Sequence, residues 1–175
     1  MPNTSNAMVA GLQKAAGAWR FWALALVLMG LDQVTKIWAN TELTYDQPVV
    51  ITSFFNLTLR YNYGAAFSFL YDASGWQRWM FAIIATVVSI GLVVWISRIS
   101  KLKDKWLEAT ALACILSGAV GNLIDRVVYG YVIDFIEVHY QNHFWPAFNI
   151  ADSAICVGAG LLILDMLLHK NTKDE

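Results

Sequence analysis

Residues 117–153 read SGAVGNLIDRVVYGYVIDFIEVHYQNHFWPAFNIADS, and this stretch indicates what kind of protein the chain is. It carries three aspartates, Asp125, Asp134 and Asp152, among long apolar runs. A carboxylate at membrane depth is costly, so such a residue marks a functional site by default. The stretch therefore predicts a functional site within a membrane. Further polar side chains in it are those of Asn122, Arg126 and Asn149.

The composition is that of an integral membrane protein. Of 175 residues, 58% are hydrophobic and only 14% are charged, against about 25% charged in ordinary soluble domains. The length suits a single domain. The net charge of −1 gives no basic field that would attract nucleic acid, so no such partner is expected. Cys114 and Cys156 both lie in apolar runs, which favours reduced packing residues over a disulfide.

Four apolar segments approach or exceed the length of about 20 residues that spans a bilayer. We expect α-helices over residues 19–39, 76–97, 106–128 and 148–168. Residues 1–18 are small and polar and predict a flexible N-terminal tail, and residues 169–175 predict a short cytoplasmic tail. The remaining chain, 19–168, is then a single membrane domain.

The segment 40–73 differs from these helices, because it is rich in β-branched and aromatic residues that partly alternate with polar ones. It predicts a small extracytoplasmic β-sheet that forms a cradle over the helix ends. Gly64 is expected at a turn or at a close approach of the backbone. The segment 129–146 is expected to be a loop.

The distribution of basic residues predicts the orientation. The segments 40–75 and 129–146 hold only Arg60, so they belong outside the cytoplasm by the positive-inside rule. Both termini are then cytoplasmic, and the polar residues of the helices gather near the outer leaflet. The basic residues expected on the cytoplasmic side are Lys14, Arg20, Arg98, Lys101, Lys103, Lys105, Lys170 and Lys173.

Two charged pairs have a structural interpretation. Asp32 and Lys36 stand at the i,i+4 spacing at which opposite charges neutralise one another on a helix face, which predicts an ion pair near the membrane boundary. Asp125 and Arg126 are adjacent at a helix end, and we expect them to hold the outer loop in position.

Asp134 and Asp152 carry the predicted chemistry. Two nearby carboxylates share a proton, so that one can accept a proton from water while the other donates one to a carbonyl oxygen. This is general acid–base hydrolysis of a peptide bond. No metal or other cofactor is expected, since His139 and His143 lie in the outer loop as solvated or interfacial residues, and no serine has a plausible histidine base.

Two other functions use the same residues. Intramembrane acids also mark the ion paths of proton- or cation-coupled transporters. Against this alternative, the sequence has no inverted repeat or paired broken helix, and no polar route to the cytoplasm is expected along the second and fourth helices. A non-catalytic assembly or chaperone subunit is the third interpretation.

Five blocks in the right order resemble the prolipoprotein signal peptidases, also called signal peptidase II. The resemblance covers nearly the whole chain after residue 18, with mild departures at Ser117 and Ile133. The blocks are DQVTK (32–36), NYGAAFS (62–68), GAVGNLIDR (118–126), VIDF (132–135) and FNIADS (148–153).

The resemblance implies the roles of the site residues. Asp134 and Asp152 match the catalytic dyad of the family. It further implies a multi-pass enzyme of the bacterial inner membrane, whose substrate is a lipoprotein precursor cut just before a cysteine that carries diacylglycerol. We expect the enzyme to be a monomer. The positions implied to support the dyad and the substrate are Asn62, Gly64, Asn122, Arg126 and Asn149.

Overall fold

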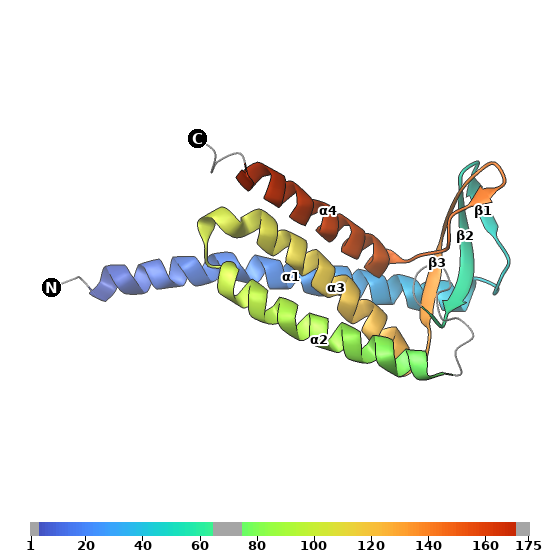
Figure 1. Ribbon diagram of the computed structural model, residues 1–175, viewed down its shortest axis with the longest axis horizontal. Helices are drawn as coiled ribbons and strands as arrows, with labels where there is room; N and C mark the ends of the chain where they lie inside the picture. Colours follow the sequence, from blue (N-terminus) through green and yellow to red (C-terminus); the bar gives the residue numbers. More distant parts are fainter. Residues whose placement is uncertain (1–3, 65–74, 171–175) are drawn as a thin grey trace.

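The computed structural model describes residues 4–64 and 75–170, and in it a bundle of helices carries a small sheet across one end (Figure 1). Within these residues, four helices are long and apolar enough to cross a membrane, as the sequence predicts. A short 3₁₀ helix, Lys103–Lys105, precedes the third of them. The long helices are α1 (Thr4–Glu42), α2 (Trp76–Ile99), α3 (Trp106–Val128) and α4 (Ile150–Lys170).

The first helix extends into the segment predicted as a flexible tail. The backbone of residues 4–17 is helical and continues without a break into the span that begins at Ala18. Alanine is the strongest helix former, and this segment contains four alanines. Adding residues to an existing helix avoids the cost of a new nucleus, so the spanning segment can propagate the helix outward.

The sheet contains more of the chain than the sequence predicted. Its four strands, in spatial order β1-β2-β3-β4, are all antiparallel. The hairpin of β1 and β2 lies in the predicted β-rich segment, whose residues 65–73 fall outside the described part. The loop predicted over 129–146 is wrong, because β3 and β4 occupy most of it. The strands are β1 (Val49–Thr52), β2 (Phe55–Asn62), β3 (Val132–Tyr140) and β4 (His143–Phe144).

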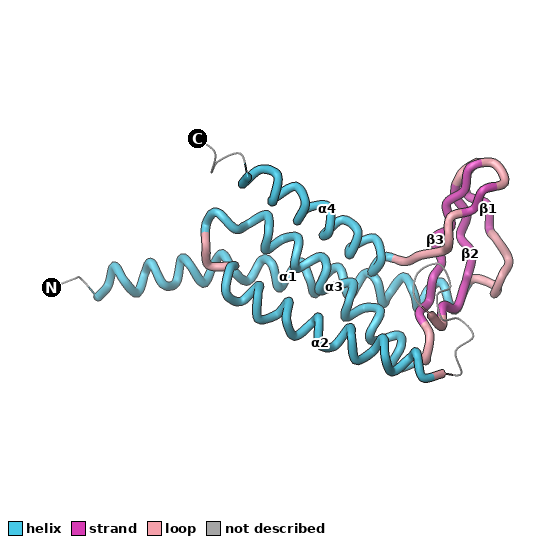
Figure 2. The backbone as a smooth tube through the Cα atoms, in the orientation of Figure 1, coloured by secondary structure: helices cyan, strands magenta, loops and turns pink. Residues whose placement is uncertain are grey.

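Pairing with β2 explains why residues 132–140 form a strand. The register runs from Asn62 opposite Val132 to Phe55 opposite Val138, with an irregularity between Leu57 and Arg60. Acidic residues at 134 and 137 interrupt the apolar alternation, which hid the strand in the sequence. Figure 2 shows the strands running across the direction of the helices, at the end opposite both chain termini.

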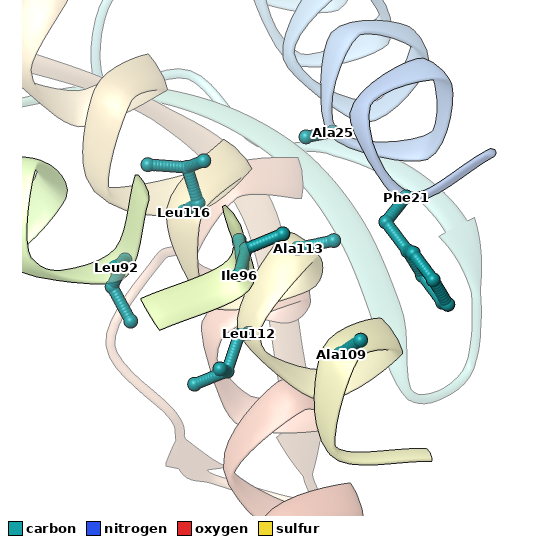
Figure 3. Packing of buried hydrophobic residues seen from close by; sticks show 8 residues of the cluster. All are labelled: Phe21, Ala25, Leu92, Ile96, Ala109, Leu112, Ala113 and Leu116. Atoms are coloured by element: carbon teal, nitrogen blue, oxygen red, sulfur yellow. The ribbon is translucent and has the colours of Figure 1, made fainter. Parts of the chain in front are cut away.

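The third helix is the centre of the bundle. In the most apolar part of its span 67% of the residues are buried, against 22% in each of the other three spans. The helix packs against α1, α2 and α4. An apolar core packs between α1, α2 and α3 (Figure 3). Its eight buried residues are Phe21, Ala25, Leu92, Ile96, Ala109, Leu112, Ala113 and Leu116.

Candidate active site

Asp134 lies on β3 with its carboxylate held by two amides. Asn149 Nδ2 donates to Asp134 Oδ1 at 2.7 Å, and Asn62 Nδ2 donates to Oδ2 at 3.2 Å. The residue is 2% exposed. Burial raises the pKa of the Asp134 carboxyl to about 8, and the nearby Asp152 carboxylate adds to the rise. The amide donors and the Lys36 ammonium oppose this shift. The site therefore favours the protonated form of the Asp134 carboxyl more than water does.

Asp152 lies in the first turn of α4, where it forms a capping box with Asn149. The backbone N–H of Asp152 donates to Asn149 Oδ1 at 2.9 Å, and the backbone N–H of Asn149 donates to Asp152 Oδ2 at 3.3 Å. Asparagine is a favoured N-cap, and an acidic residue three positions later completes the motif. The positive end of the helix dipole favours a negative charge at Asp152.

Two asparagines connect the carboxylates. Asn122, on α3, donates its Nδ2 to Asp152 Oδ1 at 2.8 Å. Asn149 Nδ2 lies 2.7 Å from Asp134 Oδ1 and 3.2 Å from Asn122 Oδ1. It therefore contacts Asp134 directly and is linked to Asp152 through Asn122. Residues from a strand and two helices thus meet at this place, and every oxygen of the two carboxylates accepts a hydrogen bond.

Lys36 occupies a buried charge cluster behind the amides. Its Nζ lies 2.9 Å from Asp32 Oδ2 and 3.0 Å from Asp125 Oδ2. The predicted i,i+4 ion pair is therefore confirmed as a contact. Asp32 and Lys36 are each 1% exposed and face α3 and α4, and their place near the membrane boundary stays a prediction. Asp32 Oδ1 also accepts the backbone N–H of Ala151 at 2.8 Å, which ties α1 to the start of α4.

Arg126 connects α3 to the segment after β2. Its Nη2 donates to the Gly64 carbonyl at 3.3 Å and its Nη1 donates to the Asn122 carbonyl at 3.2 Å. The Gly64 N–H in turn donates to Asn62 Oδ1 at 3.1 Å. Asp125 bonds elsewhere, since it accepts the backbone N–H of Ile133 at 3.1 Å. Both charged residues thus bond to segments at the sheet end of the bundle, Arg126 to Gly64 and Asp125 to Ile133.

Sequence reasoning missed two residues beside the site. Gln33 Nε2 donates to Asp32 Oδ2 at 3.1 Å and to Asp125 Oδ1 at 3.0 Å, although it lies inside a block that had been recognised. Arg78, in the first turn of α2, donates to the carbonyls of Arg126 and Val127 at 2.7 and 2.8 Å. Because these carbonyls belong to the last turn of α3, the helix itself offers them no N–H donor. An arginine at the start of a membrane helix was the available signal.

The half of α4 that points away from the sheet also holds an acidic residue. Asp165 is only 5% exposed and lies 3.4 Å from His169 Nδ1, so the helix along which no polar route is expected carries an acidic residue beside a histidine. Thirteen residues separate it from Asp152, about 20 Å along a helix. Apolar residues of α3, among them Leu112 and Leu116, occupy the core between these depths. Asp165 therefore does not join the candidate site.

Comparison with known proteins shows what this arrangement is. Spanning helices that bring two carboxylates together beside a small sheet define a multi-pass membrane enzyme. Two solved bacterial membrane enzymes share the fold. One has a TM-score of 0.76 and 34% identity, covering 88% of this chain and 91% of the other. The second has a TM-score of 0.69 and 33% identity, covering 85% and 92%.

The signal peptidase (SPase) II family model matches residues 24–168, so the chain belongs to that family. The lipoprotein signal peptidase of Teredinibacter turnerae is 57% identical over 150 residues, which cover 86% of this chain and 88% of that protein. The one from Pseudomonas putida is 57% identical over 159 residues, covering 90% and 91%. The chain is thus a multi-pass peptidase of the bacterial inner membrane that removes signal peptides from lipoproteins.

Proposed function

We propose that this peptidase is of the aspartic type, with Asp134 and Asp152 as its catalytic dyad, and that it cuts just before the diacylglyceryl cysteine of its precursor. One observation carries the proposal. Asp134, which is buried on β3, and Asp152, which is partly buried in the first turn of α4, are joined through Asn149, which donates to Asp134 and caps α4. Such a pair can hold one proton in a defined place.

The surroundings of the two carboxylates assign their roles. Asp134 keeps its proton at neutral pH because its pKa lies at about 8, so it acts as the general acid. Asp152 lies at a helix N-terminus and accepts hydrogen bonds from Asn122 and from the Asn149 backbone, so it acts as the ionised base.

In the reaction, Asp152 takes a proton from the attacking water while Asp134 gives its proton to the scissile carbonyl oxygen. The water oxygen bonds to the carbonyl carbon. When the C–N bond breaks, the proton on Asp152 passes to the leaving amine. The hydroxyl proton of the collapsing intermediate then returns to Asp134, which restores both carboxyl groups. Proton transfers of this kind each contribute roughly 10²–10⁴-fold to rate.

The orientation proposed for the enzyme places this chemistry at the outer leaflet. Both termini lie at the end of the bundle that faces away from the sheet (Figure 1). The basic α2–α3 connection, at residues 101–105, lies at that same end. Asp152 is in the first turn of α4 beside the sheet, so the positive-inside rule puts the dyad near the outer surface.

The substrate's lipid sets its register in this proposal. Each CH₂ group transferred into the bilayer contributes about 0.8 kcal/mol, so two acyl chains hold the modified cysteine at membrane depth. The monomer then needs only to bring Asp134 and Asp152 to the adjacent peptide bond. Binding energy from the lipid can be used for orientation, so its loss lowers kcat as well as raising KM.

The test compares one precursor in lipidated and unlipidated form, in the same detergent micelles, with the products identified by mass. We expect cleavage before the modified cysteine, and a much slower reaction with the unlipidated form in both kcat and KM. Equal rates for the two forms, or cleavage at another bond, would contradict the proposed specificity.

A further inference from the structure

All three protons of the Lys36 ammonium are directed at acceptors within the protein. Besides Asp32 and Asp125, Lys36 Nζ donates to Asn122 Oδ1 at 2.9 Å. An ammonium has three donors and no acceptor, and this one is 1% exposed. A structural ion pair needs only one carboxylate, so the third contact calls for a separate explanation.

That contact fixes which way the Asn122 amide faces. Its oxygen accepts from Lys36 and from Asn149 Nδ2 at 3.2 Å, and its nitrogen donates to Asp152 Oδ1 at 2.8 Å. A flipped amide would turn its NH₂ toward two donors and its oxygen toward a carboxylate. Every contact on the side chain would then be repulsive.

We propose that Lys36 is a positioning residue for the peptidase reaction, whose ammonium orients the Asn122 amide so that its NH₂ is donated to Asp152. This inference rests on the proposed dyad. Lys36 never reaches the substrate in this scheme. It acts through Asn122, and the donated hydrogen bond keeps the Asp152 carboxylate in one orientation for taking a proton from water.

The charges in the cluster decide how the inference can be tested. Asp32, Asp125 and Lys36 together carry −1, so removing the ammonium alone would leave −2 in a buried space, and the protein could fail to fold. Pairing Lys36→Met with Asp125→Asn keeps the sum at −1. The reference enzyme for the comparison is therefore Asp125→Asn, and Lys36→Gln in the same background serves if the methionine variant is not folded.

The experiment is a double-mutant cycle in single-turnover cleavage of lipidated precursor, with Lys36→Met and Asn122→Ala as its two changes in the Asp125→Asn background. We expect Lys36→Met to lower the single-turnover rate constant by roughly 10- to 100-fold, as expected for one hydrogen bond to a charged group, with KM unchanged. Once Asn122 is alanine, the same change should lower that rate constant by less than about 3-fold, because the amide it orients is gone.

The thermal midpoint provides the contrasting readout, since Lys36→Met should lower it whether or not Asn122 is present. Equal rate losses from Lys36→Met in both backgrounds would overturn the inference. This outcome is distinct from failure of the dyad, which would show as activity retained by Asp134→Asn or Asp152→Asn.

Discussion

Replacing Gly118 by alanine should move α4 away from α3 without changing any polar side chain of the site. A Cβ at this position would lie 2.2 Å from the Ala151 carbonyl oxygen and 2.6 Å from Ile155 Cγ1, whereas ordinary contact begins at 3.4 Å. Relieving the first contact requires α4 to move away from α3 by about 1.2 Å, the difference between 2.2 and 3.4 Å. Because backbone atoms are involved, no side-chain rotation can relieve it.

The displacement acts on the bond that joins those helices at the site. Asn122 Nδ2 and Asp152 Oδ1 are 2.8 Å apart, and the same shift would take them to about 4 Å, beyond hydrogen-bonding distance. A misplacement of about 1 Å can cost on the order of 10²-fold in rate. Overpacking itself should cost about 1–3 kcal/mol of stability.

The assay is single-turnover cleavage of lipidated precursor in micelles, with the thermal midpoint measured on the same samples. Gly160→Ala is the matched control on α4, because a Cβ there meets no atom within 4 Å. We expect about a 100-fold lower rate constant for Gly118→Ala and a wild-type rate for Gly160→Ala. Wild-type turnover by a folded Gly118→Ala variant would refute the argument that helix spacing sets the geometry of the dyad.

Three other predictions concern single residues. Asp125→Asn should lower the free energy of unfolding by roughly 1–3 kcal/mol together with activity, as measured by thermal melts, and loss of activity at unchanged stability would instead make Asp125 catalytic. A pH–rate profile should fall as pH rises through about 8, where Asp134 loses its proton. Stability should also fall from about pH 4 to 8, because only the folded chain keeps that proton there, and a flat profile would contradict this. Arg126→Lys should raise KM roughly 10-fold, because one ammonium cannot match the fork that holds Gly64 and Asn122, and an unchanged KM would remove Arg126 from substrate support.

The helices and the meeting of the acidic residues could be predicted from the sequence, because both follow from one-dimensional signals. Apolar runs define the spans, and charge asymmetry gives the direction of each helix. Asp152 must then lie at the same depth as Asn122 and Asp125. The capping box is also visible in the sequence as Asn149 three residues before Asp152. It is a further contact that the sequence could have predicted.

Contacts between distant segments could not be predicted in this way. The strand β3 depends on pairing with β2, and its buried Asp134 and Glu137 disguise the alternation that marks a half-buried strand. The partners of Lys36 come from two helices, one of them 86 residues further along the chain at Asn122. No spacing rule selects Asp125 rather than Arg126 as the neighbour of that lysine.

The central claim is that Asp134 and Asp152 are the catalytic dyad. It is tested most directly by comparing the turnover of variants of these two residues with that of a variant of a buried carboxylate outside the site. The measurement is single-turnover cleavage of lipidated precursor by Asp134→Asn, Asp152→Asn and the control Asp165→Asn, each at matched levels of folded protein. An amide keeps the shape of a carboxyl group but cannot cycle a proton. We expect each dyad variant to lose several orders of magnitude in rate while the control stays within a few-fold of wild type. Near-wild-type cleavage by either dyad variant would contradict the account.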